Sequence, residues 1–257
     1  MSNNKGEKQT GIDQVKLGEI FYTHKKRSPY SYEAYYSFFK TYILQHLPTD
    51  KKIRILDVGC GNGHLLYSLQ KKGYANCFGI DSCKKQIDNA RKKMDCVELV
   101  DVFQYLSCHE KEFDVIILID VAEHFGQDDL FRLLKTINNS LRQGGILIMH
   151  TINGFSPFLQ PYYYGDPTHQ QIYSSKIIGG YALLAGFKEY REFPSTPEYF
   201  PCLESINLRS FIRLLLKIGQ WFLWHLISRI YGLIEYVAVG KYKRFYTPNF
   251  IIVCEKS

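Results

Sequence analysis

The chain has 257 residues, of which 46% are apolar and 22% are charged. This length allows one large domain or two small ones with a buried core, and the composition excludes wholesale disorder. The formal net charge of +7 is mild, which argues against a protein dedicated to nucleic acid.

The seven cysteines include no CxxC pair. We therefore expect free thiols and a cytoplasmic protein. The start of the chain is polar, and no apolar run reaches the roughly 18 residues that a membrane span needs. We expect neither a secretory signal nor a membrane-spanning helix. The histidine and cysteine spacings give no zinc pattern, so we expect no metal.

Residues 17–47 are rich in tyrosine and phenylalanine. After Pro29 the aromatic residues follow a helical spacing, and Pro48 ends the pattern. We expect residues 1–47 to form a polar tail followed by an aromatic helix.

From residue 53 the chain alternates between strand and helix patterns. Such alternation predicts βαβ units, an α/β fold and a parallel sheet with helices on both faces. We assign these elements to a core of residues 48–204 and 246–257. The expected strands are 53–58, 76–80, 97–100, 113–119, 145–150, 187–193 and 249–254, and the expected helices are about 63–72, 83–93, 127–142 and 174–185.

A glycine-rich turn, residues 59–63 with the sequence GCGNG, follows the first expected strand. Gly59 and Gly61 let the backbone approach a ligand, and the next helix offers unpaired N–H groups. The dinucleotide fingerprint G-x-G-x-x-G would place its third glycine at residue 64, which is histidine. The preceding Asp57 would repel a pyrophosphate and attract an ammonium group. An NAD-dependent oxidoreductase therefore ranks below a protein whose nucleotide ligand carries an ammonium group.

Acidic residues also follow the second and third expected strands. Asp81 lies twenty residues after Gly61, a spacing that suits a carboxylate accepting both hydroxyls of a ribose. A helix N-cap is the alternative role for Asp81. Asp101 and Val102 follow the third strand, where they are placed to meet an adenine amino group.

Four segments in this order resemble motifs of the class I S-adenosylmethionine-dependent methyltransferases. They are residues 55–63 (ILDVGCGNG), 79–81 (GID), 113–124 (FDVIILIDVAEH) and 141–148 (LRQGGILI). The resemblance covers about residues 53–195. It implies a Rossmann-like seven-stranded sheet whose last strand is antiparallel, and it implies S-adenosylmethionine as the cofactor.

The resemblance also implies which residues hold that cofactor, and that the aromatic segment 17–47 covers it as a lid. The backbone around Gly59 would hold the methionine part, Asp120 would face the methionine or the methyl, Asp81 would hold the ribose, and Asp101 and Val102 would flank the adenine. The other expected cofactor contacts are Asp57, Cys60, Gly61, Ser82 and Ile119.

Methyl transfer to an oxygen is helped by a base that works near neutral pH, which favours histidine. His124, His150 and His169 all lie where loops are expected at the carboxyl edge of the sheet. We expect His169 to act as the base, with Asp166 orienting it or binding a sugar hydroxyl. His124 is expected to orient the loop over the cofactor. The alternative is that these side chains only fix the loop by hydrogen bonds.

Residues 166–174, with the sequence DPTHQQIYS, resemble a segment of methyltransferases encoded with polysaccharide and glycolipid assembly. The resemblance implies O-methylation of a sugar, a glycan or a lipid-linked glycan precursor. A small-molecule or quinone-type O-methyltransferase is one alternative. A catalytically silent scaffold that binds the cofactor or a partner enzyme is another.

Residues 205–245 lie between the last two expected strands and contain seven basic residues and one acid among aromatic and aliphatic side chains. This composition is typical of a basic amphipathic helix at a membrane interface. We expect a helical insertion whose role is left open between a pocket lid, a homodimer face and contact with an anionic membrane surface on its cytoplasmic side. RNA is the weaker explanation, because an RNA groove does not need the long aliphatic runs.

Overall fold

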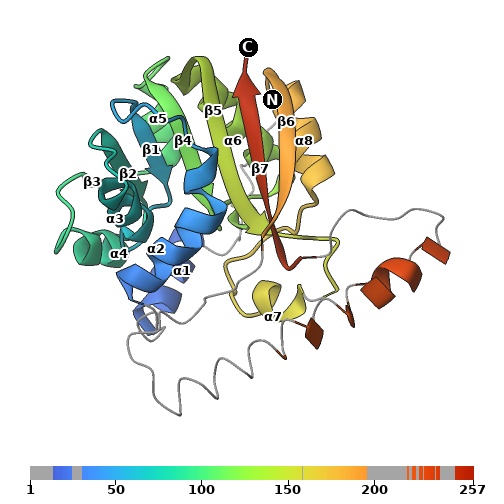
Figure 1. Ribbon diagram of the computed structural model, residues 1–257. Coiled ribbons are helices and arrows are strands. Elements are labelled where there is room, and N and C mark those ends of the chain that lie inside the picture. The colour runs from blue at the N-terminus through green and yellow to red at the C-terminus, as the bar shows by residue number, and fades with distance from the viewer. Residues whose placement is uncertain are drawn as a thin grey trace, which may run out of the picture.

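The computed structural model describes residues 14–24, 31–157, 159–195 and 247–257, with single positions and short runs between 219 and 237. Its centre is a seven-stranded sheet with the order β3-β2-β1-β4-β5-β7-β6 (Figure 1). β7 runs antiparallel to both of its neighbours, which confirms the Rossmann-like sheet expected from the sequence. The strands are β1 (Ile55–Val58), β2 (Cys77–Asp81), β3 (Val97–Leu99), β4 (Phe113–Ile119), β5 (Leu141–Ile152), β6 (Phe187–Ser195) and β7 (Asn249–Lys256).

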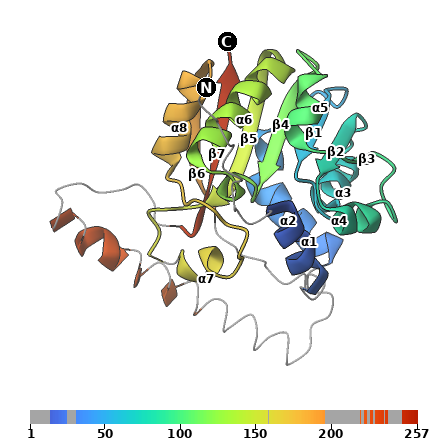
Figure 2. The same cartoon turned by 180° about the vertical axis from the view of Figure 1, so that it is seen from behind.

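Helices cover both faces of this sheet, as Figures 1 and 2 show from opposite sides. One buried cluster joins the sheet to α2, α3 and α4, and the other joins it to α5, α6 and α8. Neighbouring strand residues such as Ile55 and Leu56 belong to opposite clusters, as the two-residue period of a strand requires. The helices are α1 (Gln14–His24), α2 (Tyr32–Tyr42), α3 (His64–Lys71), α4 (Lys84–Ala90), α5 (Val102–Ser107), α6 (Gln127–Ser140), α7 (Gln160–Tyr163) and α8 (Ser175–Leu184), with short 3-10 turns η1 (Leu44–His46) and η2 (Ala122–His124).

Several elements differ from those that the sequence pattern predicts. The pattern predicts neither α1 nor α7, and α6 ends at Ser140 rather than at residue 142. β5 begins at Leu141 rather than at residue 145, because the strand continues through the two glycines with a shift in its register against β4. The pattern does not predict α5, whose six residues are too few to show a helical period. Asp101 begins this helix, and its carboxylate accepts the backbone N–H groups of Phe103 and Gln104.

The aromatic helix α2 is bound to the beginning of α3, beside the glycine-rich turn. The Tyr32 hydroxyl donates to the Asn62 carbonyl at 2.9 Å, and Glu33 accepts a hydrogen bond from the Tyr67 hydroxyl at 2.6 Å. The ring of His64 lies 4.1 Å from that of Tyr35, measured between ring centres. Burial lowers the pKa of His64 to about 4. The residue that breaks the dinucleotide fingerprint therefore packs, uncharged, against the aromatic helix.

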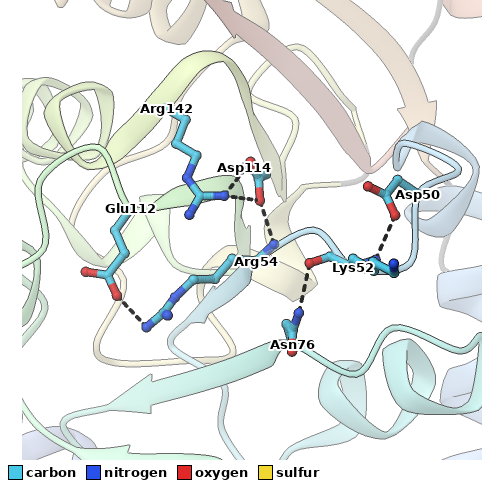
Figure 3. Close-up of polar contacts among 7 residues, drawn as sticks. All are labelled: Asp50, Lys52, Arg54, Asn76, Glu112, Asp114 and Arg142. Carbon is cyan, nitrogen blue, oxygen red and sulfur yellow. Dashed lines mark hydrogen bonds and ion pairs between the residues drawn. The ribbon is translucent and has the colours of Figure 1, made fainter.

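A network of polar side chains joins the amino-terminal ends of β1, β4 and β5, at the edge opposite the glycine-rich turn (Figure 3). Asp114 accepts the backbone N–H of Arg54 at 2.7 Å, and its two oxygens accept Arg142 Nη1 at 3.0 and 2.9 Å. The side chain of Arg54 forms an ion pair with Glu112. These contacts fix the sheet at the end away from the candidate site.

We expect Asp114→Ala to lower the free energy of unfolding by about 1–2 kcal/mol, because it removes the acceptor of a partly buried backbone N–H. The exposed ion pair with Arg142 contributes less than this hydrogen bond. Urea unfolding measures the change. Glu110→Ala is the matched control, since that exposed side chain should change stability by less than about 0.5 kcal/mol. Equal stabilities for the two variants would contradict the prediction.

The expected insertion at 205–245 lies mostly outside the described residues, so its helical structure as a whole and its role stay predictions. The few positions described there are helical and include large exposed apolar side chains such as Leu223 and Ile234. In the described part of the chain, no helix is both long and apolar enough to cross a membrane.

Candidate functional site

The glycine-rich turn connects the end of β1 to α3 and is fixed to β2. The N–H groups of Gly59 and Cys60 both donate to the Ile80 carbonyl, at 2.8 and 3.0 Å. Gly59 and Gly61 have φ angles of +70° and +55°, which side-chain-bearing residues rarely adopt. A Cβ atom at Gly59 would lie 2.6 Å from Val121, and one at Gly61 would lie 2.8 Å from Gln86 Oε1. The sequence therefore needs glycine at both positions to form this turn.

Asp81 ends β2 beside the turn, where sequence reasoning expected a ribose-binding carboxylate. Its Oδ2 accepts the N–H of Gly61 at 2.9 Å, and its Oδ1 accepts the N–H of Cys83 at 2.7 Å. Each oxygen retains a further lone pair for a ligand hydroxyl. Burial raises the pKa of Asp81, and the two backbone hydrogen bonds oppose that effect. The carboxylate thus shapes the turn as well as being available to a ligand.

Asp57 and Cys60 lie deeper than the sequence argument assumed. Asp57 is only 2% exposed, and among the described residues its Oδ2 has no hydrogen-bond partner. Burial and the nearby Asp81 raise the pKa of Asp57 well above its ordinary value. The negative charge on which the ammonium argument relied is therefore weakened at this position. The Cys60 side chain is buried against Gly79, so only its backbone is placed to meet a ligand.

Other expected cofactor contacts lie at the carboxyl ends of β2, β3 and β4. Ser82 is exposed directly after β2, and the carboxylate of Asp101 is engaged in capping α5, whose first residue is Val102. Ile119 is the last residue of β4. These placements fit the expected contacts and do not test them.

Asp120 follows β4 and has a φ angle of +53°. Its side chain is 57% exposed, so its carboxylate is accessible. Its Oδ1 lies 2.7 Å from Nδ1 of His150, whose Nε2 lies 3.0 Å from Ser195 Oγ. Partial desolvation by the surrounding residues opposes ionisation of Asp120 although its side chain is exposed, but the nearby His150 outweighs this effect and lowers the carboxyl pKa. Sequence reasoning placed Asp120 and His150 in the site separately. Their pairing comes from the parallel register of β4 and β5.

His124 lies in η2 and is hydrogen-bonded to the loop before α8. Its Nδ1 lies 3.0 Å from Thr168 Oγ1 and 3.2 Å from the Thr168 carbonyl oxygen. Thr168 Oγ1 in turn donates to Asp166 Oδ1 at 2.5 Å, and the Thr168 N–H donates to the same oxygen at 3.0 Å. Asp166 therefore connects through Thr168 to His124. The His169 N–H donates a hydrogen bond to the Asp166 carbonyl, so this contact joins backbone groups and not side chains.

His169 lies close to His124, with ring centres 4.9 Å apart. Nδ1 of His169 lies 3.0 Å from the Tyr163 carbonyl oxygen. A carbonyl only accepts, so Nδ1 carries the proton in each neutral ring and Nε2 has the lone pair. Neither Nε2 has a hydrogen-bond partner within the described residues.

Glu123 stabilises the same region, and sequence reasoning gave it no role. Its side chain is 2% exposed and accepts a hydrogen bond from Thr151 Oγ1 at 2.8 Å. The Glu123 carbonyl accepts the N–H groups of Gln170 and Gln171, at 2.8 and 3.2 Å. Burial, assisted by the nearby Asp120, raises the pKa of Glu123 to about 8. The pair Glu123-His124 in the sequence is the signal that could have identified it.

A sequence profile described as a methyltransferase domain matches residues 30–191, which is more than half of the chain. The chain belongs to this methyltransferase family. Ubiquinone biosynthesis O-methyltransferase of Pelagibacter ubique is 32% identical over 107 residues, covering 40% of this chain and 43% of that protein. The enzyme of the same name from Actinobacillus pleuropneumoniae is 34% identical over 110 residues, covering 39% and 46%. The chain thus matches less than half the length of these curated relatives.

Solved structures of SAM-dependent methyltransferases share the fold of this chain. A SAM-dependent methyltransferase from Archaeoglobus fulgidus aligns with a TM-score of 0.64 at 21% identity, covering 88% of this chain and 95% of that one. A SAM-dependent methyltransferase from Thermotoga maritima, described as a possible histamine N-methyltransferase, aligns with a TM-score of 0.62 at 17% identity, covering 95% and 100%. These similarities establish the architecture and leave the acceptor open.

The residues at the carboxyl edge fit S-adenosylmethionine, which we assign as the cofactor. The absence of a Cβ atom at Gly59 and Gly61 leaves the turn open to a closely bound ligand. Asp81 offers acceptors to ribose hydroxyls, and the accessible carboxylate of Asp120 offers a negative charge to an ammonium or sulfonium group. Asp120 is therefore better placed than Asp57 to supply the negative charge that the sequence argument assigned to Asp57.

Proposed function

We propose that this protein transfers a methyl group from S-adenosylmethionine to a hydroxyl oxygen of a small, quinone-type acceptor. The observation that carries the proposal is the pair His124 and His169, whose Nδ1 atoms are both engaged by protein acceptors. Their rings lie 4.9 Å apart beside the accessible carboxylate of Asp120. This arrangement supports a base at the carboxyl edge of the sheet, the edge that also carries the glycine-rich turn.

The proposed reaction needs alignment and removal of one proton. S-adenosylmethionine, when bound, supplies a methyl carbon activated by its positive sulfur. A hydroxyl held beside His124 and His169 forms the new oxygen–carbon bond as the sulfur–carbon bond breaks, and its proton passes to an imidazole Nε2. Burial and the neighbouring His169 lower the pKa of His124. His124 is therefore uncharged and able to accept a proton at neutral pH.

The choice of acceptor rests on the relatives and on the engagement of Asp166. The names of the ubiquinone biosynthesis relatives support a quinone-type acceptor over the glycan acceptor expected from residues 166–174. Asp166 is 8% exposed, and its Oδ1 accepts two hydrogen bonds from Thr168. Its burial makes it less accessible to a sugar hydroxyl than the sequence argument assumed. A sugar or glycan precursor is the second candidate acceptor, supported by the resemblance of that segment.

The test is transfer of a labelled methyl group to a catechol-containing quinone precursor and, separately, to nucleotide sugars. We expect product with the quinone precursor. We further expect loss of the base histidine, tested as His124→Ala and separately as His169→Ala, to lower kcat by about 100-fold or more, because general base catalysis contributes that much. Affinity for S-adenosylmethionine, measured by calorimetry, should stay within about threefold.

His109→Ala is the matched control, because that histidine hydrogen-bonds the Tyr105 carbonyl rather than the His124 and His169 pair. Its kcat should be unchanged. Product with sugars alone would replace the quinone-type acceptor by the glycan candidate. Cofactor binding with no transfer to either class would favour the silent scaffold.

For the partner of the insertion we propose an anionic membrane surface, supported by the basic balance of residues 205–245 and by exposed apolar residues such as Phe222 and Leu226. A membrane would also present a lipid-linked acceptor. Co-sedimentation with anionic vesicles but not with neutral ones is the expected result, and a concentration-dependent dimer without vesicle binding would favour the homodimer face.

A further inference from the structure

We propose that Thr168 is a positioning residue that connects the carboxylate of Asp166 to the ring of His124 and makes His124 the base of the pair. This inference rests on the proposed methyl transfer to oxygen. It assigns the role of Asp166 to His124, whereas the sequence argument assigned it to His169.

The direction of each hydrogen bond follows from the chemistry of the groups. The carboxylate of Asp166 only accepts, so the Thr168 hydroxyl donates its single proton to Asp166 Oδ1, 2.5 Å away. The lone pairs of that hydroxyl are then free to accept, and His124 Nδ1 lies 3.0 Å from Oγ1. The Thr168 carbonyl, 3.2 Å from the same Nδ1, is a second acceptor. Nδ1 therefore carries the proton, and Nε2 of His124 has the lone pair.

The same chain stabilises a positive charge on His124 when the ring accepts a second proton. Asp166 is 8% exposed and Thr168 is 5% exposed, so water does not screen this contact as it would at the surface. Burial would raise the pKa of Asp166, but the hydrogen bonds from Thr168 and the neighbouring histidines outweigh it and hold the pKa below its ordinary value. Asp166 is thus ionised at neutral pH and provides a fixed negative charge two hydrogen bonds from the base.

His169 lacks this connection. The acceptor for its Nδ1 is the Tyr163 carbonyl, which is neutral. The other ionisable groups that act on His124 are His169, which lowers its pKa, and Asp120, which raises it. Glu123 precedes His124 in the chain, and its raised pKa of about 8 keeps it largely uncharged at neutral pH. Asp166 is therefore the carboxylate that acts on His124 through a hydrogen-bonded side chain.

The inference is tested by Thr168→Val, which removes the hydroxyl and keeps the shape, against Thr168→Ser, which keeps the hydroxyl. The Thr168 carbonyl remains in both variants, so the tautomer of His124 should persist in both. The hydrogen-bonded connection to Asp166 is lost only in Thr168→Val. We expect Thr168→Val to lower kcat about tenfold and Thr168→Ser to stay within about threefold of the wild type.

The pH dependence separates positioning from a merely structural role. Losing an acceptor that favours the imidazolium lowers the pKa of His124, so the acid limb of the kcat profile should move to lower pH in Thr168→Val. Histidine NMR titration, which needs no turnover, should show the pKa of His124 falling by about 0.5–1 in Thr168→Val and remaining unchanged in Thr168→Ser.

The outcomes distinguish this inference from the proposed function. Equal pKa values for His124 in the valine and serine variants would overturn the role of Thr168, whether or not the wild type turns over. A shifted His124 pKa in a protein that transfers no methyl group to oxygen would confirm the hydrogen-bonded connection and overturn the catalytic role assigned to it. A shift of the His169 resonance instead of the His124 resonance would return Asp166 to the assignment made from the sequence.

Discussion

Asp81→Ala is expected to weaken binding of S-adenosylmethionine by about 100-fold or more. The substitution removes the proposed acceptor for the ribose hydroxyls and leaves the N–H groups of Gly61 and Cys83 without their 2.9 and 2.7 Å partners. Hydrogen bonds to an ionised group contribute about 1.5–3 kcal/mol each, and about 1.4 kcal/mol corresponds to a tenfold change in affinity. Loss of two such hydrogen bonds to the ribose hydroxyls therefore accounts for the expected change in affinity. Calorimetric titration measures it.

The control for this experiment is Asp88→Ala. Asp88 lies on α4, a few residues after Asp81, and its carboxylate forms an exposed ion pair with Lys84 at 2.6 Å. Such pairs contribute little, so affinity should stay within about twofold. If the folded Asp81→Ala protein bound S-adenosylmethionine as tightly as the wild type, Asp81 would not belong to the cofactor site and would only stabilise the glycine-rich turn.

Gly59→Ala is expected to abolish measurable cofactor binding while Gly144→Ala leaves it intact. Both glycines have a φ angle of +70°, so alanine at either position costs about 1–2 kcal/mol of folding free energy from the left-handed backbone. Only at Gly59 would the new Cβ atom meet a neighbour, Val121 Cγ2 at 2.6 Å; at Gly144 no atom lies within 4 Å. The glycine-rich turn must then shift, and its N–H groups with it.

Thermal unfolding and calorimetry of the two variants test this prediction together. Similar losses of stability with a selective loss of binding in Gly59→Ala are the expected result. Adding Val121→Ala to Gly59→Ala removes the colliding methyl group and should restore part of the affinity. Cofactor binding by Gly59→Ala as tight as that of Gly144→Ala would show that the turn does not approach the cofactor closely.

The sequence by itself determined the fold and the position of the glycine-rich turn, because both depend on local rules. Alternating strand and helix patterns require a parallel sheet covered on both faces, and the seven strands observed follow the predicted order along the chain. Glycine at residues 59 and 61 is needed for the observed φ angles, which a sequence shows directly. The methyltransferase resemblance followed from the same segments and agrees with the family match.

Local rules were insufficient where an element was short. The six residues of α5 give no clear helical period, so Asp101 could be read as a ligand contact without its role as an N-cap. The glycines at 144 and 145 resemble a turn in sequence, yet they lie within β5, because pairing with β4 and β7 decides where a strand begins.

Tertiary structure alone decided which acid acts on which base. Asp120 and His150 are 30 residues apart, and Thr168 and His124 are 44 residues apart; each pair forms because parallel strands bring their carboxyl ends to one edge of the sheet. The burial of Asp57 is likewise a tertiary property, because all four residues of β1 are buried once the strand lies between β2 and β4. Composition and spacing identify the residues of such a site, but hydrogen bonds between distant segments exist only once the chain has packed.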